Sequence, residues 1–376
     1  MSGVYIHIPY CHSKCDYCNF FSIASKRGRN DIAKAICAEA ELRHDYLAEK
    51  NISTIYFGGG TPSLLPAGDI ELILICLHKI FSVEPTAEIT LETNPDDLNR
   101  EKLSAWRQAG INRLSIGIQS FFADDLAWLN RRHDAAQARK SIEHAISAGF
   151  SNISIDLIFG IPSQNTKRLE ENLVIFGSYK LPHLSAYTLT VEPDTALAWK
   201  IKKNKISGVT EEEQSRQFLF LMQWMESEGF EQYEISNYCL PGFESRHNAA
   251  YWEGKSYLGL GPSAHSFNGI SRQWNINNVN RYIETTRTGR LEFEKEVLTV
   301  VQHHNEFIMT AIRTGAGIEF DAYKNRFGKE KLVLLKMACS DFIRKGWLHE
   351  TNNYLKLSLQ GKLFADHIAA ELFELP

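Results

Sequence analysis

The sequence predicts an α/β protein: a partial (β/α)6 barrel followed by a small C-terminal α+β domain of winged-helix-like type. Three observations lead to this prediction. Strand and helix patterns alternate six times, a polar or glycine-bearing turn follows each strand pattern, and the pattern changes after residue 229. Strand–helix alternation implies parallel strands joined by right-handed crossovers. A doubly wound open sheet is the alternative arrangement for the same six repeats.

Each repeat begins with a short run rich in β-branched and aromatic residues and continues with helical periodicity. Asn99 is placed to cap one helix, and Gly110, Gly149 and Gly229 follow helical stretches as stop signals do. The expected strands are 4–8, 53–57, 88–93, 113–118, 152–159 and 184–190, and the expected helices are 29–48, 67–81, 100–109, 123–148, 167–179 and 211–227.

Polar or reactive residues lie at or near the end of every expected strand. In (β/α) barrels the functional site forms where the strands end and the turns begin. We therefore expect these residues to meet in one shared pocket. They are Tyr5 and the cysteine loop after it, the glycine turn 58–62, Glu92, Gln119, Asp156 and Tyr187.

The repeat pattern ends with the sixth helix, so the barrel is expected to span residues 1–230. Residues 231–300 are rich in Asn, Gly, Tyr and Trp and are expected to form a connecting region of loops and short elements. A small domain is expected at 301–376. Its expected elements are helices 303–313, 320–327, 331–345 and 361–373, with a hairpin of 347–350 and 354–357 around Asn352-Asn353.

The composition of this 376-residue chain is that of an ordinary globular protein. Because the net charge is −4 and the expected wing has no concentrated basic face, no nucleic-acid partner is expected. The longest apolar run, at 70–77, is far shorter than the roughly 20 residues that span a membrane, and no signal peptide is visible. We expect a cytoplasmic protein with no transmembrane segment.

Three of the seven cysteines, Cys11, Cys15 and Cys18, lie in one loop with the spacing C-x3-C-x2-C. Clustered cysteines in a reducing compartment more often bind metal or do chemistry than form disulfides. Thiolates are the usual ligands of iron–sulfur clusters, and three of them leave one iron of a [4Fe–4S] cluster without a protein ligand. That iron can take the amine and carboxylate of S-adenosylmethionine (SAM), whose reductive cleavage yields a 5′-deoxyadenosyl radical.

A structural zinc site is the alternative, because His7 or His12 can complete a Cys3His set with the same thiols. The position of the loop at the first strand end of a barrel favours the cluster. The scattered cysteines are expected to be small buried apolar residues. They are Cys37, Cys76, Cys239 and Cys339.

The glycine turn 58–62, Gly-Gly-Gly-Thr-Pro, lets the backbone approach a ligand closely, since glycine has no side chain and allows positive φ. We expect it to receive the amino group of SAM. Glu92 and Asp156 can accept hydrogen bonds from an amine or from ribose hydroxyls. Gln119 can donate and accept, and Arg131 can pair with a carboxylate. Taken singly, each of these side chains is also compatible with a structural role.

Together these motifs resemble the radical SAM superfamily, and within it the oxygen-independent coproporphyrinogen III oxidase-like branch. Order and spacing match over roughly residues 1–240, and the tail resembles the small C-terminal domain of that branch. The motifs are the Tyr5-x5-Cys11 lead-in, Tyr17 before Cys18, GGGTP at 58–62, Glu92 in LETNPDD, Gln119 in SIGIQSF, Arg131 in LNRRH and Asp156 in SIDLIFGIP.

The resemblance implies a [4Fe–4S] cluster with SAM on its open iron, and it implies which residues contact SAM. Tyr5, Gly59 and Glu92 are expected to contact the SAM on the cluster. The same region, where the true oxidases hold a second SAM, is expected to be lined by Gly60, Thr61, Gln119, Arg131 and Asp156. Tyr17 is also expected to contact SAM.

Two features separate this sequence from the true oxidases of the branch. Those enzymes carry an N-terminal extension of several dozen residues, whereas ten residues precede Cys11 here. The segment 246–252, Arg-His-Asn-Ala-Ala-Tyr-Trp, contains H-N-x-x-Y-W and resembles the signature of HemW-type heme chaperones, which bind heme and pass it to heme proteins. We therefore expect a heme chaperone with an electron donor and heme-accepting partners. A coproporphyrinogen III oxidase and a non-catalytic metal-binding scaffold are the alternatives.

The heme-binding candidates in this signature are His247, Asn248, Tyr251 and Trp252. Imidazole is a common axial ligand of heme iron, and aromatic rings can stack on a flat macrocycle. His265 is a second candidate ligand. The residue chemistry leaves equally open that His247 is an ordinary loop histidine and that its aromatic neighbours pack a domain junction.

Overall fold

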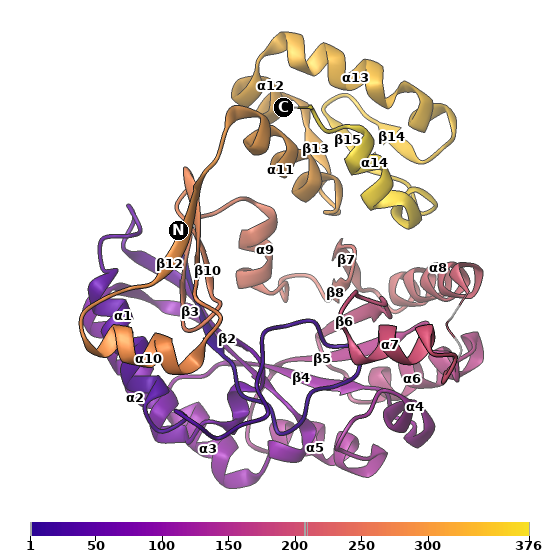
Figure 1. The fold of residues 1–376 in the computed structure, drawn as a ribbon. Helices are drawn as coiled ribbons and strands as arrows, with labels where there is room; N and C mark the ends of the chain where they lie inside the picture. The colour runs from indigo at the N-terminus through magenta and orange to yellow at the C-terminus, as the bar shows by residue number, and fades with distance from the viewer. Residues whose placement is uncertain (1, 207, 209, 376) are drawn as a thin grey trace.

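The computed structural model describes residues 2–206, 208 and 210–375. Six parallel strands lie side by side in the order of the sequence, and the helices that join them cover the outer face of the curved sheet (Figure 1). Because the strand order never reverses, the sheet is a partial barrel and the doubly wound alternative is wrong. The strands are β1 (Ser2–Ile8), β2 (Asn51–Gly59), β3 (Ser82–Thr93), β4 (Arg113–Gln119), β5 (Asn152–Phe159) and β6 (His183–Thr188).

Alternation along the strands gives the barrel an apolar outside and a polar inside, because successive side chains point to opposite faces of a sheet. Residues such as Ile6, Phe57 and Leu91 are fully buried against the helices. Their neighbours, such as Tyr5, Tyr56 and Glu92, line the concave face. The helices of the outer layer are α1 (Ile32–Leu42), α2 (Ala67–Ile80), α3 (Arg100–Gln108), α4 (Ala123–Trp128), α5 (Ala135–Ser147) and α6 (Thr166–Ser178).

One expected helix, 123–148, is divided into α4 and α5, and the break has a physical cause. Asn130 adopts a left-handed conformation with φ of 56°, which ends the first helix. Asp134 and Gln137 then form a capping box that starts α5. The break carries Arg131 out of the helical layer and toward the strand ends. Helix α1 is also shorter than the expected 29–48, whereas α8 (Glu211–Ser227), which follows α7 (Ala196–Lys202), has the expected bounds.

The segment 231–300 does more than connect two domains, since its strands extend the barrel sheet at both edges to twelve strands. Strands β7 (Glu231–Glu234) and β8 (Asn237–Cys239) add to β6, and β9 (Tyr257–Leu260) pairs in parallel with β1. Strands of three to five residues are too short to show a period in the sequence. The other elements of the segment are α9 (Arg246–Trp252), β10 (His265–Phe267), β11 (Ser271–Asn275), α10 (Val279–Arg287) and β12 (Phe293–Val297).

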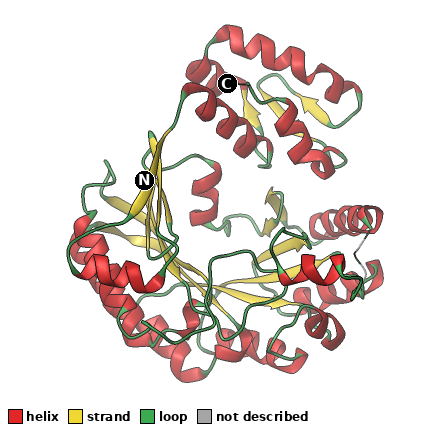
Figure 2. Ribbon diagram, viewed as in Figure 1, coloured by secondary structure: helices red, strands yellow, loops and turns green. Residues whose placement is uncertain are grey.

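The C-terminal domain has a hydrophobic core of its own, in which Ile308, Tyr323 and Leu355 are buried. Four helices and a small sheet build it, in agreement with the four helices and the hairpin that the sequence predicts (Figure 2). The short strand β13 was not expected, and the last helix is preceded by a 3-10 turn at Gly361–Phe364. The elements are α11 (Val300–Ile312), β13 (Ile318–Glu319), α12 (Phe320–Phe327), α13 (Lys329–Arg344), β14 (Leu348–Glu350), β15 (Tyr354–Leu357) and α14 (Ala365–Glu371).

The C-terminal domain contacts the barrel beside α9, which lies on the concave side of the sheet (Figure 1). The backbone N–H of Gly315 donates to the carbonyl oxygen of Tyr233 at 2.9 Å. The guanidinium of Arg313 lies 5.6 Å from the ring centre of Trp252 at the end of α9. Across the described residues, no helix is long and apolar enough to cross a membrane.

Candidate functional site

The three clustered cysteines line a cavity of about 700 Å³ where the barrel strands end. The glycine turn and the ends of β3 to β6 form its other walls. Eight of the nine residues predicted to contact SAM line this same cavity. Tyr5 is not among the lining residues, and its hydroxyl lies 3.1 Å from His7 Nδ1. The eight are Tyr17, Gly59, Gly60, Thr61, Glu92, Gln119, Arg131 and Asp156.

The cysteine loop is fixed at its neck and at its tip. At the neck, the N–H of Cys11 donates to the carbonyl of Ile23 at 3.0 Å. His7 Nε2 lies 2.9 Å from the carbonyl oxygen of Phe21, which holds the returning strand of the loop. At the tip, Asp16 forms an ion pair with Lys200 of α7. The loop therefore presents its thiols from a defined backbone.

A zinc site of the Cys3His type has no support in this geometry. The ring nitrogens of His7 are bound to the Tyr5 hydroxyl and the Phe21 carbonyl, and His12 Nε2 lies 3.5 Å from Asp97 Oδ1. In the part of the chain that the structure describes, no three His, Cys, Asp or Glu side chains are grouped to hold a single metal ion. A cubane instead spreads its thiolate ligands over separate irons.

A chain of hydrogen bonds links two of the thiols around the cavity wall. Thr61 Oγ1 donates to Cys11 Sγ at 3.5 Å, and Asn94 Nδ2 donates to Thr61 Oγ1 at 3.1 Å. Arg131 Nη2 donates to Asn94 Oδ1 at 2.7 Å, and its Nη1 donates to Cys15 Sγ at 3.3 Å. The chain of donors therefore fixes the positions of these two sulfurs at the cavity wall.

The glycine turn packs so closely on β1 that side chains have no room in it. A Cβ on Gly60 would lie 2.8 Å from the carbonyl oxygens of Ile8 and Tyr10. A Cβ on Gly59 would lie 2.5 Å from the His7 ring, and its φ of 108° suits only glycine. The turn therefore presents bare backbone to the cavity, as a close-fitting ligand requires.

Two partly buried carboxyl groups face the cavity from β3 and β5. Glu92 accepts hydrogen bonds from the Tyr56 hydroxyl at 2.8 Å and from the Gly59 N–H at 3.2 Å. Burial raises the pKa of Glu92 to about 7, and burial raises the pKa of Asp156, which accepts from Ser115 Oγ at 3.2 Å, to about 6. A cationic ligand would stabilise both carboxylates, because an opposite charge favours the ionised form.

His247, a heme-binding candidate from sequence, has both ring nitrogens within hydrogen-bond distance of neighbouring side chains. The side chain is 2% exposed and lies inside the barrel. Its Nδ1 lies 2.8 Å from Thr54 Oγ1 and its Nε2 lies 2.9 Å from the Tyr251 hydroxyl. Trp252 faces Arg313 of the C-terminal domain, and His265 lies against Trp274 with ring centres 6.0 Å apart. The signature residues therefore do not converge on one open heme pocket.

Two contributors to the cavity region were missed from sequence. Asn94 bridges Thr61 and Arg131, and its Asn-Pro pair marks a turn at a strand end without showing what it bonds. Tyr56 holds Glu92 from the neighbouring strand. Its place between Thr54 and Gly58 on the inward-facing alternation of β2 was the available signal.

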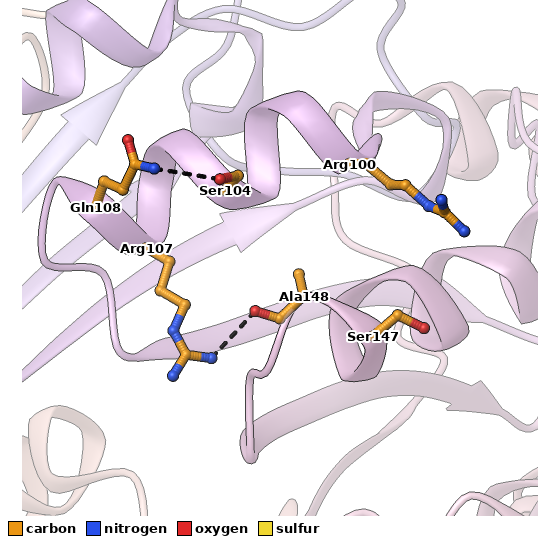
Figure 3. A pocket seen from close by; sticks show the side chains of 6 residues that line it. All are labelled: Arg100, Ser104, Arg107, Gln108, Ser147 and Ala148. Carbon is orange, nitrogen blue, oxygen red and sulfur yellow. Dashed lines mark hydrogen bonds between the residues drawn. The ribbon is translucent and has the colours of Figure 1, made fainter.

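A second hollow of about 660 Å³ lies on the outer face between α3 and α5 (Figure 3). Arg107 crosses it and donates to the carbonyl of Ala148 at 3.1 Å. None of the predicted site residues lines it, and a buried ionisable group does not face it. Its lining is Arg100, Ser104, Arg107, Gln108, Ser147 and Ala148.

A partial (β/α)6 barrel with three cysteines beside a glycine turn at its strand ends defines the radical SAM class. Comparison with known proteins agrees. Residues 5–173 match the radical SAM superfamily, and residues 298–364 match the HemN C-terminal domain. The solved structure of coproporphyrinogen III oxidase (HemN) from Escherichia coli, described as a radical SAM enzyme, superposes with a TM-score of 0.85 over 99% of this chain and 89% of that chain at 20% identity.

Two relatives match nearly end to end. The heme chaperone HemW of Bacillus subtilis (strain 168) is 32% identical over 98% of this chain and 98% of that protein. The heme chaperone HemW of Mycobacterium tuberculosis (strain H37Rv) is also 32% identical, over 98% of this chain and 94% of that protein. The chain therefore belongs to the radical SAM superfamily and, within it, to the family of the heme chaperone HemW proteins.

Proposed function

We propose that the chain is a heme chaperone with a SAM-binding [4Fe–4S] cluster, which binds heme and transfers it to heme-accepting proteins. The observation that carries the proposal is the end-to-end similarity to proteins named heme chaperone HemW. The likeness to HemN supports the shared fold alone, since identity is 20%. The coproporphyrinogen III oxidase therefore remains the second candidate, and the metal-binding scaffold the third.

The residues around the cavity fit the cluster and its ligand. Cys11, Cys15 and Cys18 would hold three irons, and the bare turn at Gly59 and Gly60 leaves space beside them for SAM. When bound, the cluster supplies the open iron and the electron that cleave SAM. Arg131 donates a hydrogen bond to the sulfur of Cys15 and places its positive charge beside the cysteine loop.

Glu92 and Asp156 would bind the polar groups of SAM. Both carboxyl groups are partly buried and already accept hydrogen bonds from one or two donors, so their oxygens are oriented before the ligand enters. Gln119 adopts a φ of 68° at the end of β4, which turns the backbone at the cavity wall. No heme ligand is proposed at His247, because both of its ring nitrogens are bound inside the barrel.

One experiment separates the three candidates. Anaerobically reconstituted protein is given heme in one sample, and coproporphyrinogen III, SAM and a strong reductant in another. A chaperone binds about one heme per chain and yields no protoporphyrinogen. Formation of protoporphyrinogen at a useful rate would replace the proposal with the oxidase, and a tetrahedral zinc with no iron would replace it with the scaffold.

A further inference from the structure

We propose that His247 is a positioning residue of the SAM site, which acts through Tyr56 on Glu92, and that it does not ligate heme. The inference rests on the proposed SAM site. It gives the HNxxYW signature a role that follows from its contacts inside the barrel.

The first step is that α9 is fixed to the barrel from within. The backbone N–H groups of Arg246 and His247 each donate to the carboxylate of Glu88 on β3, both at 3.1 Å. Glu88 is 5% exposed, so these bonds are shielded from water. The start of the helix therefore moves with β3, the strand that also carries Glu92.

The second step is that the spacing of the signature makes an internal hydrogen bond. Residues four apart lie on the same face of a helix, so Tyr251 stands next to His247, and its hydroxyl lies 2.9 Å from Nε2. Nδ1 is held by Thr54 Oγ1 at 2.8 Å. The HxxxY spacing thus fixes the imidazole plane without any external ligand.

The third step is contact between the fixed imidazole and Tyr56. The two rings stack with centres 5.0 Å apart and an interplanar angle of 22°. Tyr5 lies against both rings, with its ring centre 6.2 Å from that of Tyr56 and 6.4 Å from that of His247. A Cβ on Gly3 would lie 3.2 Å from the imidazole and 2.7 Å from Thr54 Oγ1, so β1 is close on that side as well.

The last step is the hydroxyl of Tyr56, which donates to Glu92 Oε1 at 2.8 Å. Glu92 Oε2 accepts from Gly59 in the cavity wall at 3.2 Å. The His247 imidazole therefore positions the Tyr56 ring, and the Tyr56 hydroxyl in turn positions the Glu92 carboxylate. A smaller residue at 247 leaves space beside Tyr56, and the loosened hydroxyl no longer stabilises the ionised form of Glu92.

The ionisation of Glu92 is also under the influence of other groups from the surrounding strands and α9. The charge of Asp156 disfavours the ionised form of Glu92, and the charge of Arg113 favours it. Four tyrosine hydroxyls also lie near the Glu92 carboxyl group. All of these groups except Tyr56 are common to the variants below, so differences between variants report the Tyr56 contact. The groups are Tyr5, Tyr56, Arg113, Asp156, Tyr187 and Tyr251.

The test measures the dissociation constant of SAM between pH 6 and 8.5 for anaerobically reconstituted protein. Wild type is compared with H247A, H247Q, Y56F and the double variant H247A/Y56F. His304→Ala is the matched control, since His304 is also buried and its Nε2 lies 2.6 Å from the Tyr323 hydroxyl, but in the C-terminal domain. Iron content and far-UV circular dichroism establish that each variant is folded and loaded.

We expect wild-type affinity to rise through about pH 7 and the rise to move to higher pH in both H247A and Y56F. At pH 7 each weakens binding about 3- to 10-fold, since one pKa unit is tenfold. The double variant is no weaker than Y56F alone, because both changes remove one pathway. H247Q, which keeps two polar contacts, lies close to wild type, and His304→Ala is unchanged.

Heme binding supplies the independent measurement. If His247 positions Tyr56, the absorption spectrum of added heme is the same in wild type, H247A and Y56F. A heme spectrum that changes in H247A alone, while SAM affinity stays at the wild-type value, overturns the inference and indicates that His247 ligates heme. Additive effects in the double variant overturn it as well, because they show separate pathways. Wild type that binds no SAM overturns the proposed site itself, and the inference with it.

Discussion

Arg131 Nη1 lies 3.3 Å from the sulfur of Cys15, although 116 residues separate the two in the chain. The same guanidinium donates to Asn94 Oδ1 at 2.7 Å and to the carbonyl of Gly117 at 2.9 Å. One planar, permanently charged group therefore joins the cysteine loop to the ends of β3 and β4.

Arg131→Gln should leave the cluster assembled but lower its reduction potential, because a positive charge and a hydrogen bond to the thiolate are lost. SAM binding should weaken about tenfold, as expected when a charge-assisted hydrogen bond is removed. Redox titration followed by electron paramagnetic resonance and equilibrium dialysis measure the two effects. Arg132→Ala is the control, since Arg132 is half exposed and pairs with Asp96. Equal effects of the two variants would contradict the role of Arg131.

Cluster assembly should depend on the three clustered cysteines alone. Replacement of Cys11, Cys15 or Cys18 by Ala should abolish the broad thiolate-to-iron absorption and the roughly four irons of a [4Fe–4S] protein. Replacement of the four scattered cysteines together by Ser should leave both unchanged. Iron analysis and visible spectra under anaerobic conditions decide the outcome. Iron retained without Cys15 would show that another ligand completes the site.

Two glycines provide a stability test of the turn. Gly60→Ala should lower the free energy of unfolding by about 1–3 kcal/mol, because the new methyl meets backbone carbonyl oxygens at 2.8 Å that cannot rotate away. Gly68→Ala in α2 should be neutral or stabilising by about 1 kcal/mol, since nothing lies within 4 Å and alanine favours helix. Urea unfolding of the two variants measures the difference. Equal stabilities would mean that the turn is not tightly packed.

Glu92 should make stability depend on pH in a definite direction. Its pKa is about 7 in the folded chain against an ordinary 4.5, so the folded state binds the proton more tightly. Its contribution to stability is therefore fully present below pH 4.5 and is lost as the pH rises through 7. Glu92→Gln removes this loss, and its stability relative to wild type should increase from pH 5 to pH 8 by at most on the order of 3 kcal/mol. Chemical unfolding at the two pH values measures it. A relative stability that falls or stays constant would contradict the raised pKa of Glu92.

The strand–helix rhythm and the cysteine spacing were sufficient to predict the barrel and the cavity that its strand ends form. Local signals are strong there, because alternation and periodicity follow directly from which face is buried. Arg131 was predicted as a site residue, but the helix break that places it depends on Asn130 and the capping box at Asp134. Such a break involves few residues, so the helical periodicity over the whole segment 123–148 does not reveal it.

The HNxxYW segment shows what the sequence could not predict. His247 is adjacent in space to Thr54 and Tyr56, nearly 200 residues earlier in the chain. The pairing of β9 with β1 and the hydrogen bonds to Glu88 on β3 hold α9 in the barrel. A histidine followed by tyrosine and tryptophan has the chemistry of a heme ligand, and the composition of the segment does not reveal that the imidazole is enclosed. Burial of this kind is set by tertiary contacts.

Heme transfer is the most direct test of the proposed chaperone. Heme-loaded protein is mixed with an apo heme protein, and the absorption of the acceptor is followed with heme alone and with an equal amount of unrelated heme-binding protein as controls. The proposal predicts that the acceptor gains its native spectrum and that one heme leaves the chain for each acceptor filled. A chain that binds no heme, or that retains it while the controls fill the acceptor equally fast, would contradict it.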